Sequence, residues 1–317
     1  MRKLALFVAL LVAADQVVGR GLDALYRRCT TGETGGLIND VLRRQVDVLV
    51  LGSSRAQHHV VPRILKRKLG LSAYNAGLDG QDLLYAVMLF DVWTAKHGAP
   101  KLVLLQVDPW SFRRSATELQ RADIFAPFVS RSAEVRAVLA LRGRYEPLKL
   151  LSYSYRFNGK VLAILKNALV RPNDAFDGYE GIPGAMTSGA DVPASEDAME
   201  LATRGQPPWD RKLALFGQLA AYCRQNGTRL ILFHSPRYST DAPRLRAWDE
   251  ELAALLKGYP DVDYIDGETQ FARAFTGKSE LFHDATHLNA RGAELFTSLL
   301  AGEVAARLKK TRSVSSL

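Results

Sequence analysis

The chain has 317 residues, of which 47% are hydrophobic and 24% are charged, and its formal net charge is +9. The positive charge is spread in short clusters, and no basic stretch is interleaved with aromatic residues, so a nucleic-acid partner is not expected. The two cysteines, Cys29 and Cys223, form no CxxC or Cys/His pattern, which argues against a zinc site. We therefore expect one large core, or one core with an appendage, and neither a metal nor a cofactor.

The N-terminus has the pattern of an export signal. Arg2 and Lys3 precede the apolar run Leu4–Ala14, which ends in small residues suited to cleavage. The run continues to Val18, which also permits an uncleaved anchor, although a carboxylate at Asp15 is costly deep in lipid. We assign 1–19 to a signal or membrane anchor and 20–45 to a membrane-proximal lead-in, and we expect an exported protein, periplasmic or on the cell surface. The alternative is a cytosolic protein whose N-terminal helix is buried.

From residue 46 onward, strand-like and helix-like segments alternate, which predicts an α/β domain over 46–317. The predicted strands are the short apolar runs Val46–Leu51, Ser72–Asn75, Leu102–Val107, Arg229–Phe233 and Val262–Ile265. The predicted helices, with apolar residues at helical spacing, are Arg63–Leu69, Leu83–His97, Arg211–Gln225, Arg244–Leu256 and Arg291–Leu308.

The alternation breaks between 111 and 210, where we predict an insertion. Ala133–Leu141 and Leu148–Leu169 have helical spacing, whereas Arg171–Pro208 is rich in Gly, Pro, Ser and Asp. We interpret the latter as a mobile loop or an excursion over the active-site edge, which the helices of the insertion would partly cover.

A serine motif follows the first strand. Gly52-Ser53-Ser54 stops the apolar run and leads into a helix, which places a hydroxyl at the carboxyl edge of the sheet. Open α/β sheets carry their chemistry at that edge. The alternative is that the serines only cap the helix.

A second motif, Asp284-Ala285-Thr286-His287, stands just before the terminal helix. Its spacing lets the carboxylate hold its own histidine in one tautomer, so that the other ring nitrogen can take a proton from a serine. Capping of the terminal helix is again the alternative.

Taken together, these motifs resemble those of the SGNH (GDSL-type) hydrolase superfamily. The resemblance covers Asp47–Trp110 and Arg229–Leu308, and it implies a three-layer α/β/α fold with a mainly parallel, five-stranded, flavodoxin-like sheet. It makes Ser54 the nucleophile, His287 the base and Asp284 the residue that orients His287. Asn75–Asp82 is similar to the second motif block of the superfamily, which implies that Gly80 donates to the oxyanion and places Asn75 at the substrate site.

The third block departs from the superfamily pattern. After its third strand the superfamily has an asparagine that donates to the oxyanion, whereas this chain has Gln106-Val107-Asp108. The loss of one such donor costs about a hundredfold or more in rate. We expect the backbone N–H groups of Ser54 and Gly80, or the guanidinium of Arg55, to act instead, with Asp108 near the pocket mouth orienting Arg55.

Other residues have alternative interpretations. Ser53 is a rival nucleophile, although the superfamily pattern favours the second serine. His58 and His59 are best explained as satisfied histidines on a helix surface. His234 lies on the correct edge, where it would line the pocket, but it has no carboxylate nearby in the sequence. The remaining candidates are His283, which we expect to face away, and Trp110 and Phe112, which would either stack on a sugar ring or pack in the core.

We expect a serine esterase or O-acyltransferase that acts on an acylated glycan, or on a small ester, outside the cytoplasm. The membrane-proximal start and the Gly-Ser-Ser-Arg sequence look like the exported, DltD-like branch associated with polysaccharide O-acylation, which implies a membrane-bound O-acyltransferase as partner. The alternative is a non-catalytic scaffold that binds polysaccharide or such an acyltransferase. A nucleotide-binding protein is disfavoured, because the chain has no Gly-x-Gly-x-x-Gly or Gly-x-x-x-x-Gly-Lys loop.

Overall fold

The structure is a computed structural model that describes residues 1–32, 35–169, 177–186, 205–239 and 247–315. The chain divides into two compact units, each described by itself below. The helical unit comprises Met1–Gln45, Met88–Lys96 and Ala116–Asp174. The sheet unit comprises Val46–Val87, His97–Ser115 and Ala175–Leu317.

The sheet unit is built on five parallel strands in the order β2-β1-β3-β4-β5. They are β1 Val48–Leu51, β2 Ala73–Asn75, β3 Leu102–Gln106, β4 Arg229–His234 and β5 Val262–Asp266. In register, Val48 of β1 lies opposite Leu102 of β3, and Leu104 lies opposite Ile231 of β4. This is the flavodoxin-like order, so the predicted fold class is confirmed, with every strand pair parallel.

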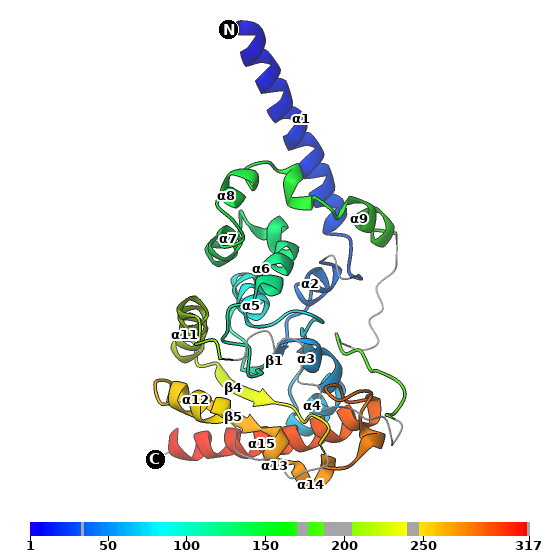
Figure 1. The fold of residues 1–317 in the computed structure, drawn as a ribbon, viewed down its shortest axis with the longest axis vertical. Coiled ribbons are helices and arrows are strands. Elements are labelled where there is room, and N and C mark those ends of the chain that lie inside the picture. Colours follow the sequence, from blue (N-terminus) through cyan, green and yellow to red (C-terminus); the bar gives the residue numbers. More distant parts are fainter. Residues whose placement is uncertain (33–34, 170–176, 187–204, 240–246, 316–317) are drawn as a thin grey trace. The chain divides into compact units, whose positions relative to one another are not determined.

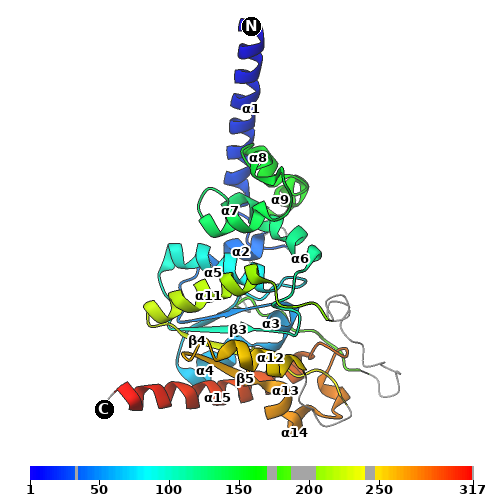
Figure 2. The same cartoon turned by 60° about the vertical axis from the view of Figure 1, so that its left-hand side comes forward.

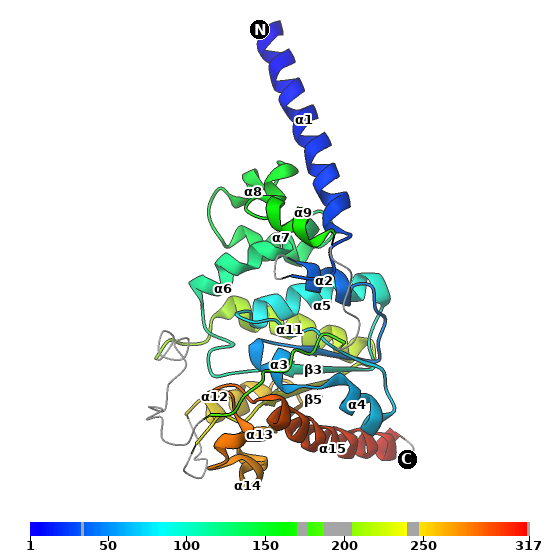
Figure 3. The ribbon, with the colours of Figure 1, turned by 90° about the vertical axis from the view of Figure 1, so that its right-hand side faces the viewer.

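Helices cover both faces of the sheet (Figures 2 and 3). One face carries α11 (Asp210–Gln225) and α12 (Ala247–Leu256), and the other carries α4 (Pro62–Leu69) and α15 (Ala290–Ser315). The central strands β1 and β3 are buried throughout, because side chains on both faces meet helices. The core on the α4 and α15 side includes Val48, Val50, Leu104, Ile231 and Phe296.

Short helices follow two of the strands at the carboxyl edge. After β1, Gly52 adopts φ +143°, and a Cβ at this position would lie 2.7 Å from Cβ of Gln106, so only glycine fits the turn into α3 (Ser54–His59). After β5 the chain forms α13 (Gly267–Gln270), α14 (Ala272–Phe275) and the 3₁₀ helix η4 (Ser279–Leu281) before it reaches α15. The Asp284–His287 loop therefore lies just ahead of α15.

The helical unit begins with α1 (Arg2–Tyr26), which runs without a break through the predicted signal or anchor and into the first residues of the predicted lead-in (Figure 1). By length and composition α1 is able to cross a membrane, and only 6% of its most apolar window is buried. The other elements of this unit are α2 (Gly36–Val41), α6 (Ala116–Arg121), η1 (Ala122–Phe128), α7 (Ala133–Ala140), α8 (Glu146–Lys149), η2 (Ser154–Phe157) and α9 (Val161–Asn167). Helix α5 (Leu83–His97) contributes residues to both units.

One predicted segment differs from the structure. Leu148–Leu169 is not one helix but the end of α8, then η2 and α9, because Ser152 and Ser154 turn their hydroxyls to Asp15 and Gly159 adopts φ +73°. Most of the predicted loop Arg171–Pro208, and the start of the helix predicted from Arg244, lie outside the described residues.

Candidate active site

The two sequence motifs meet at the carboxyl edge of the sheet. Ser54 is the first residue of α3, and its Oγ lies 2.9 Å from Nε2 of His287. On the other side of the ring, Nδ1 of His287 lies 3.0 Å from Oδ2 of Asp284 and 3.1 Å from Oδ1. The hydroxyl, imidazole and carboxylate thus form one hydrogen-bonded series, as in a serine hydrolase triad.

The Asp284–His287 loop holds its own carboxylate in place. Oδ1 of Asp284 accepts hydrogen bonds from the backbone N–H groups of Thr286 and His287, each at 2.8 Å, and from the Thr286 hydroxyl at 3.0 Å. Partial burial raises the pKa of Asp284, but the hydrogen bonds from His287 and from the two backbone N–H groups outweigh burial and hold this pKa well below its usual range. An ionised Asp284 favours the tautomer of His287 that carries its proton on Nδ1, which leaves Nε2 able to accept the Ser54 proton.

A second histidine, His59, ties α3 to the histidine loop. Its Nε2 accepts a hydrogen bond from the backbone N–H of Leu288 at 2.9 Å, and its Nδ1 lies 2.8 Å from the Ser235 hydroxyl. His59 is fully buried, and burial, with the nearby Arg55 cation, holds its pKa well below the usual value. His59 is therefore neutral, and it fixes the residue next to His287 relative to the helix that carries Ser54. The prediction of a surface position was wrong for His59, although the ring is satisfied as expected.

The predicted pairing of Asp108 with Arg55 is present, but it is buried rather than at a pocket mouth. Nη1 of Arg55 donates to Asp108, and Nη2 donates to the backbone oxygen of Ser235. Both side chains are almost fully buried. Although burial raises the pKa of Asp108, the Arg55 charge and the His234 hydrogen bond hold this pKa well below its usual range.

His234 has carboxylate neighbours that the sequence did not reveal. Its Nδ1 lies 3.0 Å from the backbone oxygen of Val107 and 3.2 Å from Oδ1 of Asp108, and its Nε2 lies 3.1 Å from Oε2 of Glu268. The ring is fully buried, so His234 belongs to the charged network behind α3.

The structure separates the roles of the two serines. The Ser53 hydroxyl caps α3 by accepting from the Arg55 N–H at 3.2 Å, and it donates to Oε1 of Gln106 at 2.7 Å. The same Gln106 oxygen accepts from the Ser53 N–H at 3.1 Å. Ser53 is thus held by α3 and β3, whereas Ser54 faces the imidazole.

Two predicted site residues are committed to other contacts. The Asn75 amide donates to the backbone oxygens of Ala56 and Val60, each at 2.7 Å, and its oxygen accepts from the Gly77 N–H at 3.0 Å. Asn75 therefore holds the end of α3 against the loop after β2. The Arg55 guanidinium is likewise occupied by Asp108 and Ser235.

The two backbone N–H groups expected to bind an oxyanion, those of Ser54 and Gly80, make no hydrogen bond to a described residue. The N–H of Ser54 has no helical partner because it is in the first turn of α3. The N–H of Leu78 donates to the oxygen of Gly52 at 3.2 Å and thereby holds the Gly80 loop beside the turn that presents Ser54.

One described part of the predicted loop, Asp177–Met186, runs along this edge. The side-chain oxygen Oε2 of Glu180 accepts a hydrogen bond from the Gln57 amide at 3.0 Å, and the N–H of Glu180 donates to the backbone oxygen of Gln57 at 3.3 Å. The backbone oxygen of Glu180 lies 2.6 Å from Nδ1 of His58. The N–H of Met186 donates to the backbone oxygen of Phe282. The His58 ring stands edge-on to His287, with centroids 5.9 Å apart.

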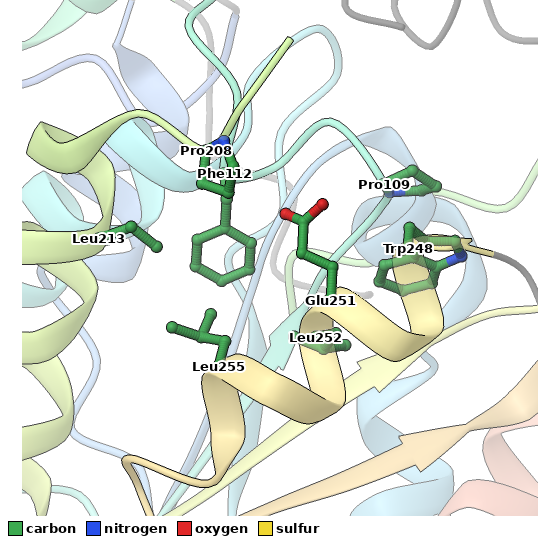
Figure 4. A pocket seen from close by; sticks show the side chains of 8 residues that line it. All are labelled: Pro109, Phe112, Pro208, Leu213, Trp248, Glu251, Leu252 and Leu255. Carbon is green, nitrogen blue, oxygen red and sulfur yellow. The ribbon is translucent and has the colours of Figure 1, made fainter. Parts of the chain in front are cut away.

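The remaining aromatic candidates pack in the interior. Trp110 and Phe112 are both buried, and Phe112 contacts Phe216 of α11 edge-on at 5.5 Å. Figure 4 shows the ring of Phe112 in an apolar cavity between α11 and α12, with Trp248 also in its lining; the volume of this cavity is about 210 Å³.

His283 is exposed, and its Nδ1 lies 3.0 Å from the backbone oxygen of Pro183. Within the described ranges, no group of three or more His, Cys, Asp or Glu side chains is placed to hold a metal ion.

Comparisons with known proteins are sparse. No protein-family model matches the chain, and no curated protein does. Eleven chains of solved structures match. One is described as "a putative platelet activating factor from Streptococcus pneumonia"; the likeness covers 94% of this chain and 98% of that chain, at 13% sequence identity and a TM-score of 0.41. At these values it adds nothing to the functional argument, which rests on the geometry of this chain.

Proposed function

We propose that the chain is an SGNH-type serine ester hydrolase or O-acyltransferase that works through an acyl-Ser54 intermediate. The observation that carries this proposal is the series Ser54 Oγ, His287, Asp284, with its separations of 2.9 Å and 3.0 Å. These separations fall within the range that proton transfer from a nucleophile to a general base requires.

In the first half-reaction, Oγ of Ser54 attacks the ester carbonyl carbon while its proton passes to Nε2 of His287. The ionised Asp284 stabilises the resulting imidazolium. When the tetrahedral intermediate collapses, the bond to the leaving alkoxide breaks and His287 returns the proton to that alkoxide. The acyl group is then bonded to Ser54, and water or a sugar hydroxyl, activated by His287, removes it. Water releases the free acid, whereas a sugar hydroxyl makes the reaction a transfer.

The oxyanion of the intermediate would be held by the backbone N–H groups of Ser54 and Gly80, which no described group occupies. Arg55 is an unsuitable donor because Asp108 and Ser235 already hold its guanidinium. With two backbone donors and no side-chain donor, we expect a rate about a hundredfold below that of an enzyme with a complete oxyanion hole.

For the substrate, we propose an O-acylated glycan of the cell envelope, reached from the extracytoplasmic side of the membrane, with a membrane-bound O-acyltransferase as partner. The apolar helix α1 supports a membrane location. The substrate class and the DltD-like assignment rest on the sequence motifs alone.

A second candidate is a non-catalytic scaffold with the same partners. The missing third-block asparagine favours it, because Asp108, which follows the third strand instead, is buried against Arg55 and supplies no oxyanion donor. Against it, the Ser54–His287–Asp284 series has hydrogen-bonding geometry throughout, which a scaffold does not need.

The test uses the full-length protein in mild detergent with 4-nitrophenyl acetate as substrate. We expect slow, saturable hydrolysis that is lost in Ser54→Ala and retained in Ser53→Ala. A folded wild-type protein that neither hydrolyses the ester nor reacts with a fluorophosphonate probe would favour the scaffold instead.

A further inference from the structure

Exposed apolar side chains are concentrated in the helical unit. Among the described residues, the large hydrophobic side chains that are exposed lie in segment 1–18 or in segment 141–169, apart from Leu295, which is at the margin. The second group forms what we call the apolar collar: Leu141, Tyr145, Leu148, Leu151, Val161, Leu162, Leu165 and Leu169. Leu151 is 70% exposed and Leu162 is 83% exposed. A soluble surface does not normally gather so many apolar side chains in one segment.

We propose that the apolar collar is a second membrane-contacting surface, immersed in the lipid interface around the retained anchor α1. The occupant is the bilayer that α1 itself enters. This inference is independent of the proposed ester chemistry, since every residue that carries it lies in the helical unit.

The collar is attached to the side of α1. Asp15, midway along α1, accepts four hydrogen bonds: from the hydroxyls of Ser152 and Ser154, at 2.6 and 2.5 Å, and from the backbone N–H groups of Tyr153 and Ser154, at 2.7 and 3.0 Å. One turn further along α1, Gly19 lies so close to Tyr153 that a Cβ there would be 2.6 Å from the tyrosine side chain. Segment 152–154 is therefore fixed against the middle of α1.

Helix α9, which carries the second half of the collar, is held at the end of α1. Sγ of Cys29 lies 3.4 Å from the backbone oxygen of Ile164, and Ile164 itself is buried. The three views agree that η2 and α9 lie beside the C-terminal half of α1, while its N-terminal half has no neighbour (Figures 1, 2 and 3).

The length of α1 then places the collar at the membrane. At 1.5 Å per residue, the free stretch from Arg2 to Asp15 is roughly 20 Å long, whereas the hydrocarbon core of a bilayer is about 30 Å thick. If α1 crosses the membrane, about 10 Å of it beyond Asp15 must also lie in the hydrocarbon, where η2 lies beside it and brings the collar to the lipid interface. The four hydrogen bonds satisfy the Asp15 carboxylate, which lowers the cost of placing this residue at that depth.

The polar residues of the segment suit an interface. The cations Arg144 and Arg156 lie over the rings of Tyr145 and Tyr153, at 5.7 and 4.4 Å from the ring centroids. Tyrosines and long basic side chains are favoured where hydrocarbon meets the headgroups, because each has an apolar body and a polar end. The pairing of arginines with tyrosine rings therefore favours a lipid interface over another soluble protein as the occupant of the collar.

The test places an environment-sensitive nitrobenzoxadiazole label on single cysteines of the full-length chain, reconstituted in vesicles of phosphatidylethanolamine and phosphatidylglycerol. Leu151→Cys and Leu162→Cys report on the collar, with Leu148→Cys and Leu165→Cys as a second pair if either variant fails to fold. Leu11→Cys in α1 is the positive control, and Gln120→Cys, an exposed polar position of α6 in the same unit, is the matched negative control. The native Cys29 and Cys223 are buried, and unmutated protein measures their background labelling.

We expect lipids with a nitroxide on the acyl chain to quench the collar labels several-fold more than the label at Gln120, as they quench the label at Leu11. Quenching at Leu151 and Leu162 no greater than at Gln120 would overturn the proposal. A blue-shifted emission without quenching would also overturn it, because the collar would then be covered by protein. Intact mass of the membrane-bound chain checks that α1 is retained, and loss of residues 1–14 would contradict its role as anchor.

Discussion

Oγ of Ser54 lies 2.9 Å from Nε2 of His287, although 233 positions separate the two residues in the chain. Two further contacts hold the same two segments together. His59, on the helix of Ser54, accepts from the N–H of Leu288 at 2.9 Å, and Thr297 of α15 donates to the backbone oxygen of His59 at 3.0 Å. The packing of α3 against α15 and against the loop before α15 therefore holds Ser54 close to His287.

Ser53→Ala and Ser54→Ala should have opposite effects. Ser53→Ala removes the cap of α3 and the hydrogen bond to Gln106, so we expect it to lower the free energy of unfolding by about 1–2 kcal/mol and to keep ester hydrolysis. Ser54→Ala should abolish hydrolysis and leave the melting temperature unchanged, because a hydroxyl at the edge of the site contributes little to packing. Thermal melting and initial rates on the same samples measure both. If Ser53→Ala abolishes activity and Ser54→Ala does not, Ser53 is the nucleophile.

Asp284→Asn should be more damaging than Asp284→Ala. An asparagine amide next to Nδ1 favours the tautomer with its proton on Nε2, which cannot accept the Ser54 proton, and the equivalent change in a well-studied triad costs about 10⁴-fold in kcat. Alanine imposes no tautomer and should cost less. The pKa of Asp284 lies well below its usual range, so the carboxylate is ionised from about pH 4 upward. Initial rates of the wild type and both variants with 4-nitrophenyl acetate at pH 8 measure these losses, and an Asp284→Asn variant that loses no more activity than Asp284→Ala would contradict the assignment.

Asp108→Ala should be among the most destabilising single changes in the sheet unit. It leaves the Arg55 guanidinium buried without its carboxylate, at an expected cost of about 3–5 kcal/mol. The double variant Arg55→Met/Asp108→Leu should recover most of that loss, because it removes both charges. Glu294→Ala is the matched control: it breaks the exposed Arg63–Glu294 pair and should cost less than about 1 kcal/mol. Equal effects of the buried and exposed changes on denaturant unfolding would show that the Arg55–Asp108 pair is not desolvated.

His59 should make stability depend on pH. Its pKa is lowered in the folded protein, so its contribution is complete above the unfolded value of about 6.5 and is lost as the pH falls toward the folded value. Between pH 7 and 5, His59 takes up a proton in the unfolded chain but stays neutral in the folded protein. This difference lowers the free energy of unfolding by up to about 1.4 kcal/mol per pH unit. In His59→Gln this part of the slope should disappear, whereas Ser235→Ala, which retains the imidazole, should keep it. Identical slopes in wild type and His59→Gln would refute a neutral, buried His59.

The strands and the contact between Asp284 and His287 were predictable because their signals are local. Each strand is a short run of apolar residues between turn formers, and Asp284 and His287 are close enough in sequence for one loop to join them. The pairing of Asp108 with Arg55 was predictable because each residue follows, within one turn of chain, a strand that ends at the same edge.

The buried network was not predictable, since its partners come from distant parts of the chain. The sequence near His234 does not indicate that Asp108 and Glu268 flank its ring. The sequence near Asn75 likewise does not indicate that its amide donates hydrogen bonds to α3. Leu148–Leu169 was mistaken for a helix because its apolar spacing is helical, while the reason for the break, the carboxylate of Asp15, is 137 positions away from Ser152.

The most direct test of the proposed chemistry is peptide mapping by mass spectrometry after treatment of the full-length protein with a fluorophosphonate. The account predicts a single adduct on Ser54 in the wild-type protein and in Ser53→Ala, much slower labelling in His287→Ala, and no adduct in Ser54→Ala. An adduct on another residue, or a folded wild-type protein that takes up no probe, would contradict it.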